Sequence, residues 1–459
     1  MLSLSDLSFL AVPLPEDLQR LKAFGDFEGL ERAIASRLCR ELPLALQKRL
    51  LLEREIIRLL PRSYPYSEEE ALARCRTAFE GFTPQELWAL REEGAVDWLY
   101  CQGEPRYKDD FVETLVKSRP SYAARYADAQ QVRARQVYFQ ALEDAIGEMR
   151  REGCARRRIR VRITAQVREE AAKPGETIRV HLPLPVGGAQ VERVRMLSMR
   201  PACGVVGAQD SPLRTVFFEK PYAPGDVFSL EYEYDIVQRY VEPRVEQVLS
   251  EQPDLYLQEQ PPHIAFTPFI RSLAQQIVGE ETNPLSKARR IYDYLTQKVT
   301  YSYVRPYMTY TNLPEAMLLS GKGDCGLYAL SFIVLCRCAG VAARWQSGMA
   351  AGPFSISSHD WAQFYAAPYG WLFADCSFGG AAWREGALKR WDFYFGNLDP
   401  FRLPAASAFQ QPLRPAMRFL RNDPYDNQTG DAEFESGRVE AEDWLVEREL
   451  LSIETLAAP

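Results

Sequence analysis

In the first third of the chain, apolar residues such as Leu and Ile are mixed with Glu and Arg, a composition typical of helices. Residues 42–60 are rich in Leu, Ile, Glu and Arg, and residues 132–151 are rich in Ala, Glu and Arg. Prolines separate these stretches. We therefore predict an N-terminal helical domain over residues 1–152. Packing support for the rest of the protein is its simplest role. A surface that binds a protein partner and a lid are the alternatives.

After Gly153 the apolar residues fall at every second position, which is the pattern of a half-buried strand. Turn-forming sequences such as Lys173-Pro174-Gly175 separate these runs. Antiparallel strands are expected at residues 159–167, 178–184, 190–199, 215–220 and 228–236. Together they predict a small β-sandwich domain over residues 153–246.

Residues 247–384 combine both patterns. Small and apolar residues at helical spacing follow Asp324, and Gly340 is a natural helix stop. Two aromatic-rich runs, residues 360–366 and 371–376, flank a Pro-Tyr-Gly turn and predict a β-hairpin. This mixture predicts an α+β core.

The composition changes again beyond residue 384, where aromatic and turn-forming residues accumulate. We expect residues 385–459 to form an extension that packs on the core, which makes the whole a multidomain α+β protein. The polar stretch 422–431 lacks the ligand spacing of an EF-hand loop. Turns held by Asx hydrogen bonds are therefore expected there, and no metal ion or other cofactor is expected.

Three residues of the predicted core suit nucleophilic catalysis. Cys325 lies in Gly-Asp-Cys-Gly, His359 in Ser-His-Asp-Trp, and Asp375 follows Trp-Leu-Phe-Ala. A thiolate can attack a carbonyl carbon, an imidazole can move the proton, and a carboxylate can fix the imidazole tautomer. Cys325, His359 and Asp375 are therefore the candidate catalytic residues.

The local sequence predicts where these side chains lie. Asp324 can cap a helix whose first turn carries Cys325, where the helix dipole and free N–H groups favour a thiolate. The hairpin places His359 and Asp375 on neighbouring strands, where side chains lie roughly 5 Å apart. We expect the Cys325 sulfur within about 4 Å of a ring nitrogen of His359, and Asp375 hydrogen-bonded to the other nitrogen.

Residues 301–380 resemble the transglutaminase-like core, a papain-like cysteine acyltransferase module, in a bacterial-type multidomain protein. The matching pieces are, in order, Gly-Asp-Cys-Gly at 323–326, Cys-Ala-Gly-Val-Ala-Ala-Arg at 338–344, His-Asp-Trp at 359–361, and Asp375. The resemblance implies that Cys325 is the nucleophile, His359 the base and Asp375 the orienting acid. It also agrees with a β domain that precedes the core.

Members of this family often carry a Trp or Gln upstream of the cysteine as a second oxyanion donor. This chain has no Trp between Trp98 and Trp345, so a different residue has to take that place. The candidates are Tyr301, Tyr303 and Gln297. The aromatic residues expected to line the cleft are Trp361, Trp371 and the tyrosines of residues 301–310.

The bulk composition narrows the class of protein. The net charge of −7 over 459 residues disfavours broad nucleic-acid binding. The basic cluster at residues 156–162 begins with three consecutive arginines, and from Ile159 on its arginines alternate with apolar residues, as on the solvated face of a strand. Nine cysteines without a CxxC pair indicate free thiols in a reducing compartment. No signal peptide or membrane span is predicted, so a cytoplasmic protein without membrane contact is expected.

The other two histidines have simpler interpretations. His181 lies within a predicted strand, and His263 lies in a proline-containing loop without a nearby Asp, Glu or Cys in the sequence. Both are expected to serve packing.

Two functions remain open. In the first, Cys325 forms a thioacyl intermediate with a peptide, protein or amide substrate. Water as acceptor gives a peptidase or amidase, which we favour, and an amine acceptor gives a transglutaminase. In the second, a non-catalytic binding or scaffold protein keeps the fold. The presence of all three candidate residues favours the enzyme.

Overall fold

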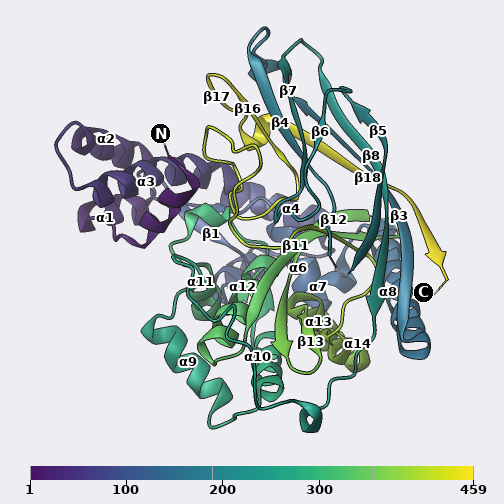
Figure 1. Cartoon of the computed structure of the whole chain (residues 1–459). Helices are drawn as coiled ribbons and strands as arrows, with labels where there is room; N and C mark the ends of the chain where they lie inside the picture. Colours follow the sequence, from purple (N-terminus) through teal and green to yellow (C-terminus); the bar gives the residue numbers. More distant parts are fainter. Residues whose placement is uncertain (1, 189, 354, 458–459) are drawn as a thin grey trace.

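The computed structural model describes residues 2–188, 190–353 and 355–457. The first three helices lie to one side, a two-sheet β domain lies above, and a mixed α+β region lies below (Figure 1). The prediction of a multidomain α+β protein is confirmed.

The N-terminal domain is helical, as predicted. Its longest helices match the two charged stretches identified in the sequence, and the capping box of Ser67 and Glu70 starts one of the shorter ones. The hairpin in this domain was not predicted. The elements are η1 (Leu4–Ala11), α1 (Glu16–Phe24), α2 (Phe27–Leu38), α3 (Leu44–Ser63), α4 (Glu68–Ala78), α5 (Pro84–Glu92), β1 (Trp98–Cys101), β2 (Glu104–Tyr107), α6 (Phe111–Ser118), α7 (Pro120–Arg125) and α8 (Ala129–Glu152).

The β domain is a sandwich of two antiparallel sheets. One sheet has the order β17-β16-β4-β7-β6 and the other β18-β3-β8-β5. Alternate residues such as Ile159 and Val180 point inward and are fully buried, which produces the core between the sheets. The strands are β3 (Cys154–Val167), β4 (Thr177–Pro183), β5 (Val191–Arg200), β6 (Val205–Val206), β7 (Thr215–Pro221), β8 (Val227–Arg239), β16 (Asp431–Phe434), β17 (Gly437–Arg438) and β18 (Trp444–Leu456).

The C-terminal residues divide between two regions. Strand β15 (Arg402–Ala406) joins the core sheet, and Phe409 and Tyr425 pack into the core. Strands β16, β17 and β18 instead complete the sandwich, where β18 pairs with β3 along almost its whole length. A single extension that packs on the core does not describe this arrangement, because the sandwich needs strands from both parts of the chain.

The arginines at positions 156, 158, 160 and 162 of β3 lie on the outer face of the sandwich, whereas Arg157 is buried and pairs with Glu148 of α8. Arg158 pairs with Asp235 at 2.8 Å, and Arg162 pairs with Glu231 at 2.9 Å and with Glu449 at 3.0 Å. Each acid comes from a neighbouring strand. Cross-strand ion pairs therefore account for the basic cluster.

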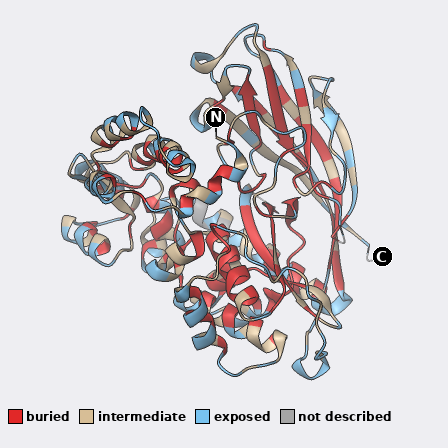
Figure 2. Cartoon of the chain, turned by 60° about the vertical axis from the view of Figure 1, so that its left-hand side comes forward, coloured by how far each residue is buried: buried red, intermediate tan, exposed pale blue. Residues whose placement is uncertain are grey.

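The α+β core surrounds one long helix, α12 (Cys325–Cys338). Residues 326–337 are buried all round, so the helix is central and not amphipathic (Figure 2). The antiparallel sheet β14-β13-β12-β11-β15 covers one side. Its strands are β11 (Ala343–Gly352), β12 (Ser355–Ala366), β13 (Gly370–Ala374) and β14 (Phe395–Gly396), and the other core elements are η3 (Val245–Gln247), α9 (Pro268–Val278), α10 (Pro284–Lys298), β9 (Thr300–Tyr301), η4 (Tyr307–Thr309), α11 (Leu313–Ser320), β10 (Lys322–Gly323), α13 (Cys376–Arg384) and α14 (Leu388–Phe393).

Among the helices in the described ranges, none is both long and apolar enough to cross a membrane.

Candidate active site

Cys325 is the first residue of α12, as the sequence predicts. Asp324 is the N-cap, and its Oδ1 accepts hydrogen bonds from the Leu327 N–H at 3.2 Å and the Tyr307 hydroxyl at 2.7 Å. Gly326 follows because a Cβ there would lie 2.0 Å from the Tyr307 hydroxyl. The thiol is partly buried at this crowded helix start.

The Cys325 thiol donates a hydrogen bond to Asp360 Oδ2 at 3.4 Å. Within the described ranges no hydrogen bond joins Cys325 to His359, and the expected approach of these two side chains stays a prediction. Successive side chains of a strand point to opposite faces. Phe364 of β12 contacts Phe332 of α12, so the even-numbered residues of β12 face the helix and Asp360 is the one that meets the thiol.

His359 and Asp375 form the predicted pair. Nε2 of His359 and Oδ2 of Asp375 are 2.8 Å apart, and both side chains are buried. Asp375 follows β13 directly and caps α13, where its Oδ1 accepts from the Phe378 N–H at 2.9 Å and the Ser377 hydroxyl at 3.2 Å. The hairpin of β12 and β13 brings the two residues together, as expected from the turn between them.

The environment of this pair is strongly charged. Burial raises the pKa of Asp375, but His359 and Arg402 outweigh it and lower that pKa to about 2. Burial is also the main influence on His359, and it lowers the pKa of the imidazole in spite of Asp375. Because an ionised carboxylate only accepts hydrogen bonds, the neutral imidazole carries its proton on Nε2 and leaves Nδ1 as a proton acceptor.

The environment of the thiol is acidic. Burial, Asp360 and Asp324 raise the pKa of Cys325 well above its ordinary value. Burial raises the pKa of Asp324 to about 6, and burial together with Asp324 raises that of Asp360, which is hydrogen-bonded to Asp426. The expectation that the helix start favours a thiolate is therefore wrong for this arrangement. Buried carboxyl groups and lost hydration outweigh the helix dipole.

Tyr301 is the best placed of the three candidate oxyanion donors. Strand β9 pairs with β10 so that Tyr301 lies beside Gly323, two residues before the thiol, and Cys325 is among the groups that raise the pKa of its hydroxyl. The Tyr303 ring packs against Tyr301 at 5.6 Å. Gln297 is exposed near the end of α10.

The helical domain borders this region. The Tyr303 N–H donates to Thr114 of α6 at 3.2 Å, and the Lys117 ammonium lies 5.0 Å from the ring of Tyr301 and 4.4 Å from that of Tyr303. Helix α6 therefore forms part of the surroundings of the thiol.

The aromatic residues expected in the cleft are only partly there. Trp361 is fully buried next to His359, and its indole N–H donates to Gln346 at 2.7 Å. Trp371 lies at the other end of the hairpin, where its ring contacts Arg344 and Tyr365. Three residues of β13 separate it from Asp375, so it does not lie beside the His359–Asp375 pair.

Sequence reasoning missed three neighbours of the site. Gln428 donates to Asp360 at 2.6 Å, Asp426 is hydrogen-bonded to the same carboxyl group, and Arg402 faces Asp375. The polar stretch 422–431 was the available signal for two of them. This stretch contains the expected Asx turn, in which the Tyr425 N–H donates to Asp423 Oδ1 at 3.0 Å. It also reaches the site through Gln428 and Asp426.

The remaining histidines are buried in packing positions. His181 contacts Thr215 through Nδ1 at 2.9 Å, and His263 contacts the Tyr425 hydroxyl through Nε2 at 3.1 Å. Burial lowers the pKa of each imidazole to about 3.

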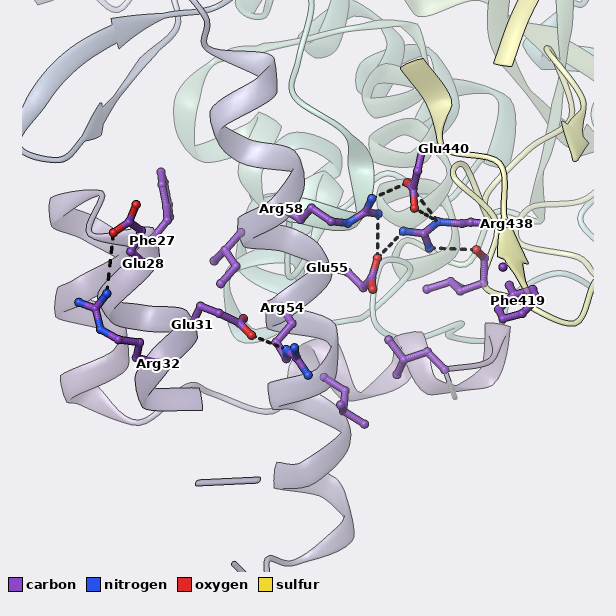
Figure 3. A pocket seen from close by; sticks show the side chains of 15 residues that line it. Phe27, Glu28, Glu31, Arg32, Arg54, Glu55, Arg58, Phe419, Arg438 and Glu440 are labelled. Atoms are coloured by element: carbon purple, nitrogen blue, oxygen red, sulfur yellow. Dashed lines mark hydrogen bonds and ion pairs between the residues drawn. The ribbon is translucent and has the colours of Figure 1, made fainter. Parts of the chain in front are cut away.

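A cavity of about 1000 Å³ lies apart from these residues, between α2, α3 and the C-terminal part of the chain (Figure 3). Arginine and glutamate side chains line it and pair with one another. Arg54 pairs with Glu31 at 2.8 Å, and Arg58 pairs with Glu440 at 2.5 Å. Its charges are thus largely satisfied within the protein.

Comparison with known proteins assigns the core. Residues 271–376 match the model of the transglutaminase-like superfamily, so the chain contains a domain of that superfamily. This range includes Cys325, His359 and Asp375. No curated protein matches the chain.

The solved structures that resemble this chain share little sequence identity with it. A protein from Cytophaga hutchinsonii, assigned as a candidate cysteine protease, is 16% identical with a TM-score of 0.38, and the match covers 66% of this chain and 90% of that one. The periplasmic domain of TgpA from Pseudomonas aeruginosa is 15% identical with a TM-score of 0.29, and covers 48% of this chain and 95% of that one.

Proposed function

We propose that this protein is a cysteine-dependent acyl-transfer enzyme that hydrolyses a peptide or amide bond through a thioacyl intermediate on Cys325. The buried His359–Asp375 pair carries the proposal. An imidazole with a carboxylate on Nε2 and a proton acceptor at Nδ1, one residue away from the partner of the thiol, is the arrangement of a general base.

The first chemical step transfers the thiol proton. Because His359 and Asp360 lie on opposite faces of β12, this step requires β12 and the start of α12 to shift so that the Cys325 thiol reaches His359. Nδ1 of His359 then takes the proton while Asp375 stabilises the imidazolium. The thiolate sulfur attacks the carbonyl carbon, and the carbonyl π electrons move to oxygen. The Cys325 N–H and the Tyr301 hydroxyl, kept neutral by its raised pKa, are the donors we assign to that oxyanion.

The second step releases the products. The tetrahedral intermediate collapses, the C–N bond breaks, and the amine leaves with the proton from His359. Water then gives a proton to His359 and attacks the thioester, and the C–S bond breaks to return the thiol and a carboxylic acid. We favour water over an amine as acceptor because Asp360 and Gln428 make the thiol side polar, whereas amine transfer needs water to be excluded.

A non-catalytic binding module is the second candidate. The contact between Cys325 and Asp360 favours it, because a thiol with a raised pKa beside a protonated carboxyl group is a poor nucleophile.

The test is hydrolysis of a panel of fluorogenic peptide and amide substrates by the full chain. Cys325→Ala and His359→Ala should each abolish turnover, because they remove the nucleophile and the base. Cys338→Ala is the matched control, since this partly buried thiol lies at the other end of the same helix. Full turnover in Cys325→Ala would overturn the enzyme proposal, and no turnover in any form would favour the binding module.

We also propose a reducing, cytoplasmic compartment. All nine cysteines are free thiols, and two of them, Cys39 and Cys203, are exposed. Exposed thiols persist where the surroundings are reducing. Fractionation of cells that express the chain would test this, and recovery outside the cytoplasm would contradict it.

A further inference from the structure

One arginine is buried completely beside the His359–Asp375 pair. Arg402 lies at the start of β15, with none of its side chain exposed, between Asp375 and Asp399. Its Nε and Nη2 donate to Asp399 Oδ2 at 3.0 Å and 2.5 Å. Its Nη1 faces Asp375 Oδ2 at 2.9 Å as an ion pair, without the geometry of a hydrogen bond.

The guanidinium is held rigidly. Asp399 accepts further hydrogen bonds from the Tyr394 hydroxyl and the Phe401 N–H, both at 3.0 Å. The Phe378 ring lies 4.4 Å from the guanidinium carbon. A planar cation that is fixed by two hydrogen bonds to one carboxylate oxygen and by aromatic packing loses little further entropy when it restrains a second carboxylate.

This restraint acts on the carboxylate oxygen that meets the imidazole. Oδ2 of Asp375 contacts both His359 Nε2 and Arg402 Nη1, while Oδ1 is held at the start of α13 by Phe378 and Ser377. All contacts of Asp375 are thus fixed. The imidazole has one orientation available, with Nδ1 free to accept a proton.

The charges also match the reaction. Arg402 with two ionised carboxylates carries a net charge of −1 while His359 is neutral, and His359 brings the cluster to zero when it accepts a proton. Protonation of His359 makes this buried cluster neutral overall. That protonation is favoured because a buried net charge, which lacks hydration, is removed.

We propose that Arg402 is a positioning residue for the His359–Asp375 pair: it fixes the carboxylate, and through it the tautomer and direction of the imidazole. The inference rests on the proposed function and extends it, since Arg402 lies outside the residues that match the superfamily. Arg402 does not touch the thiol and takes no part in bond making.

Arg402 shifts the pKa of His359 in a defined direction, which a merely structural role would not do. The charged groups that face the imidazole are Asp375, Arg402 and Asp399, and Arg402 lowers its pKa while both carboxylates raise it. Tyr138 of α8 packs near the same cluster as a neutral group, because burial raises its pKa. On the other side of β12 lies Asp360, whose pKa is raised by burial and by Asp324.

The first experiment follows the imidazole resonances of the full chain by NMR as pH changes. The chain has three histidines, and His181 and His263 are internal references that stay neutral above pH 5. Arg402→Met should raise the titration midpoint of His359, and Asp399→Asn should lower it. Arg402→Lys keeps the charge and should leave the midpoint close to wild type.

The second experiment measures turnover with the same variants. Arg402→Lys should lower kcat roughly 10–100-fold with little change in KM, as is usual when an outer partner of a reactive group is lost, because one ammonium cannot bridge two carboxylates. Arg402→Met removes the cation between two carboxylates and is at risk of unfolding. The double variant Arg402→Met with Asp399→Asn keeps the net charge of the cluster and replaces the single variant if that one does not fold.

Equal His359 midpoints in all folded variants, or full kcat in Arg402→Lys and the double variant, would overturn the role of Arg402. The two proposals fail separately. If the wild type shows no turnover, the acyl-transfer function is lost, and the His359 midpoints still decide whether Arg402 and Asp399 set the state of the imidazole.

Discussion

The two sides of β12 hold buried carboxyl groups whose pKa values are shifted in opposite directions. On one side, His359 and Arg402 keep Asp375 ionised, with a pKa of about 2. On the other, burial and the neighbouring Asp324 raise the pKa of Asp360, next to the Cys325 thiol, well above its ordinary value. Both carboxyl groups are almost inaccessible to solvent, so burial alone does not separate them. The nearest cations decide the charge.

This contrast bears on the proposed reaction. The side of Asp375 keeps a negative charge beside the imidazole that we propose as the base. On the other side, the pKa of Cys325 is raised, which slows the reaction of its thiol. In the proposed reaction, transfer of the thiol proton to His359 joins the two sides.

Loss of the charge on the base side should have the largest effect. Asp375→Asn leaves Cys325 and His359 in place but removes the anion and allows the wrong tautomer, so we expect roughly a 10²–10⁴-fold loss of kcat. Asp431→Asn is the matched control, because it alters a buried carboxylate paired with Arg421 at 2.8 Å in another region. Both kinetics and thermal melts are needed. Equal losses in the two variants would contradict a special role for Asp375.

The acidic side should be visible in the pH dependence of stability. The folded-state pKa of Asp324, about 6, is above its ordinary value of 3.8, so its contribution to stability is full below pH 4 and falls as pH rises to 6, by about 3 kcal/mol at most. Asn is an equally good N-cap.

We therefore expect Asp324→Asn to gain stability relative to wild type as pH rises from 4 to 6. Denaturant unfolding of both proteins at each pH measures this gain. Asp375 has the reverse sign: its lowered pKa stabilises the fold above pH 4, and the gain disappears as pH falls towards 2. Parallel curves for Asp324→Asn and wild type would show that Asp324 is ionised at no cost.

A smaller effect is expected on thiol reactivity. Asp360→Asn removes an acid that raises the pKa of Cys325, so alkylation of Cys325 at neutral pH should become about tenfold faster, which corresponds to about 1.4 kcal/mol. Peptide mapping by mass spectrometry gives the rate for each cysteine. Cys338 in the same sample is the control, and its rate should not change. A slower Cys325 in the variant would mean that Asp360 activates the thiol.

The smallest effect should come from the paired charges of the cavity in Figure 3. Glu440→Gln weakens contacts with Arg58 and Arg438, whose partly exposed setting limits their value to below about 1 kcal/mol. A shift in melting temperature within the scatter of repeated measurements is expected, with turnover unchanged. A loss comparable to that of Asp375→Asn would show that this contact between domains controls the site.

Local sequence patterns predicted the elements and one half of the site. The turn before Gly370 sets the hairpin, and the hairpin brings His359 to Asp375. Alternation along β12 could also have warned that Asp360, and not His359, faces α12. Arg402 and Gln428 could not be predicted, because their approach depends on how distant strands and loops pack. The inward residues of β18 were a signal for the sandwich that the composition of the C-terminal part obscured.

The β-sandwich pairs strands from distant parts of the chain, so its two sheets cannot be completed until synthesis is almost finished. Strands β3 and β4 emerge from the ribosome early, while their partners β18 and β16 emerge some 250 residues or more later. Until then, each sheet has an open edge on which other chains can pair. The nascent protein therefore depends on protection of these edges, by its own helical domain or by chaperones, until the last strands close both sheets.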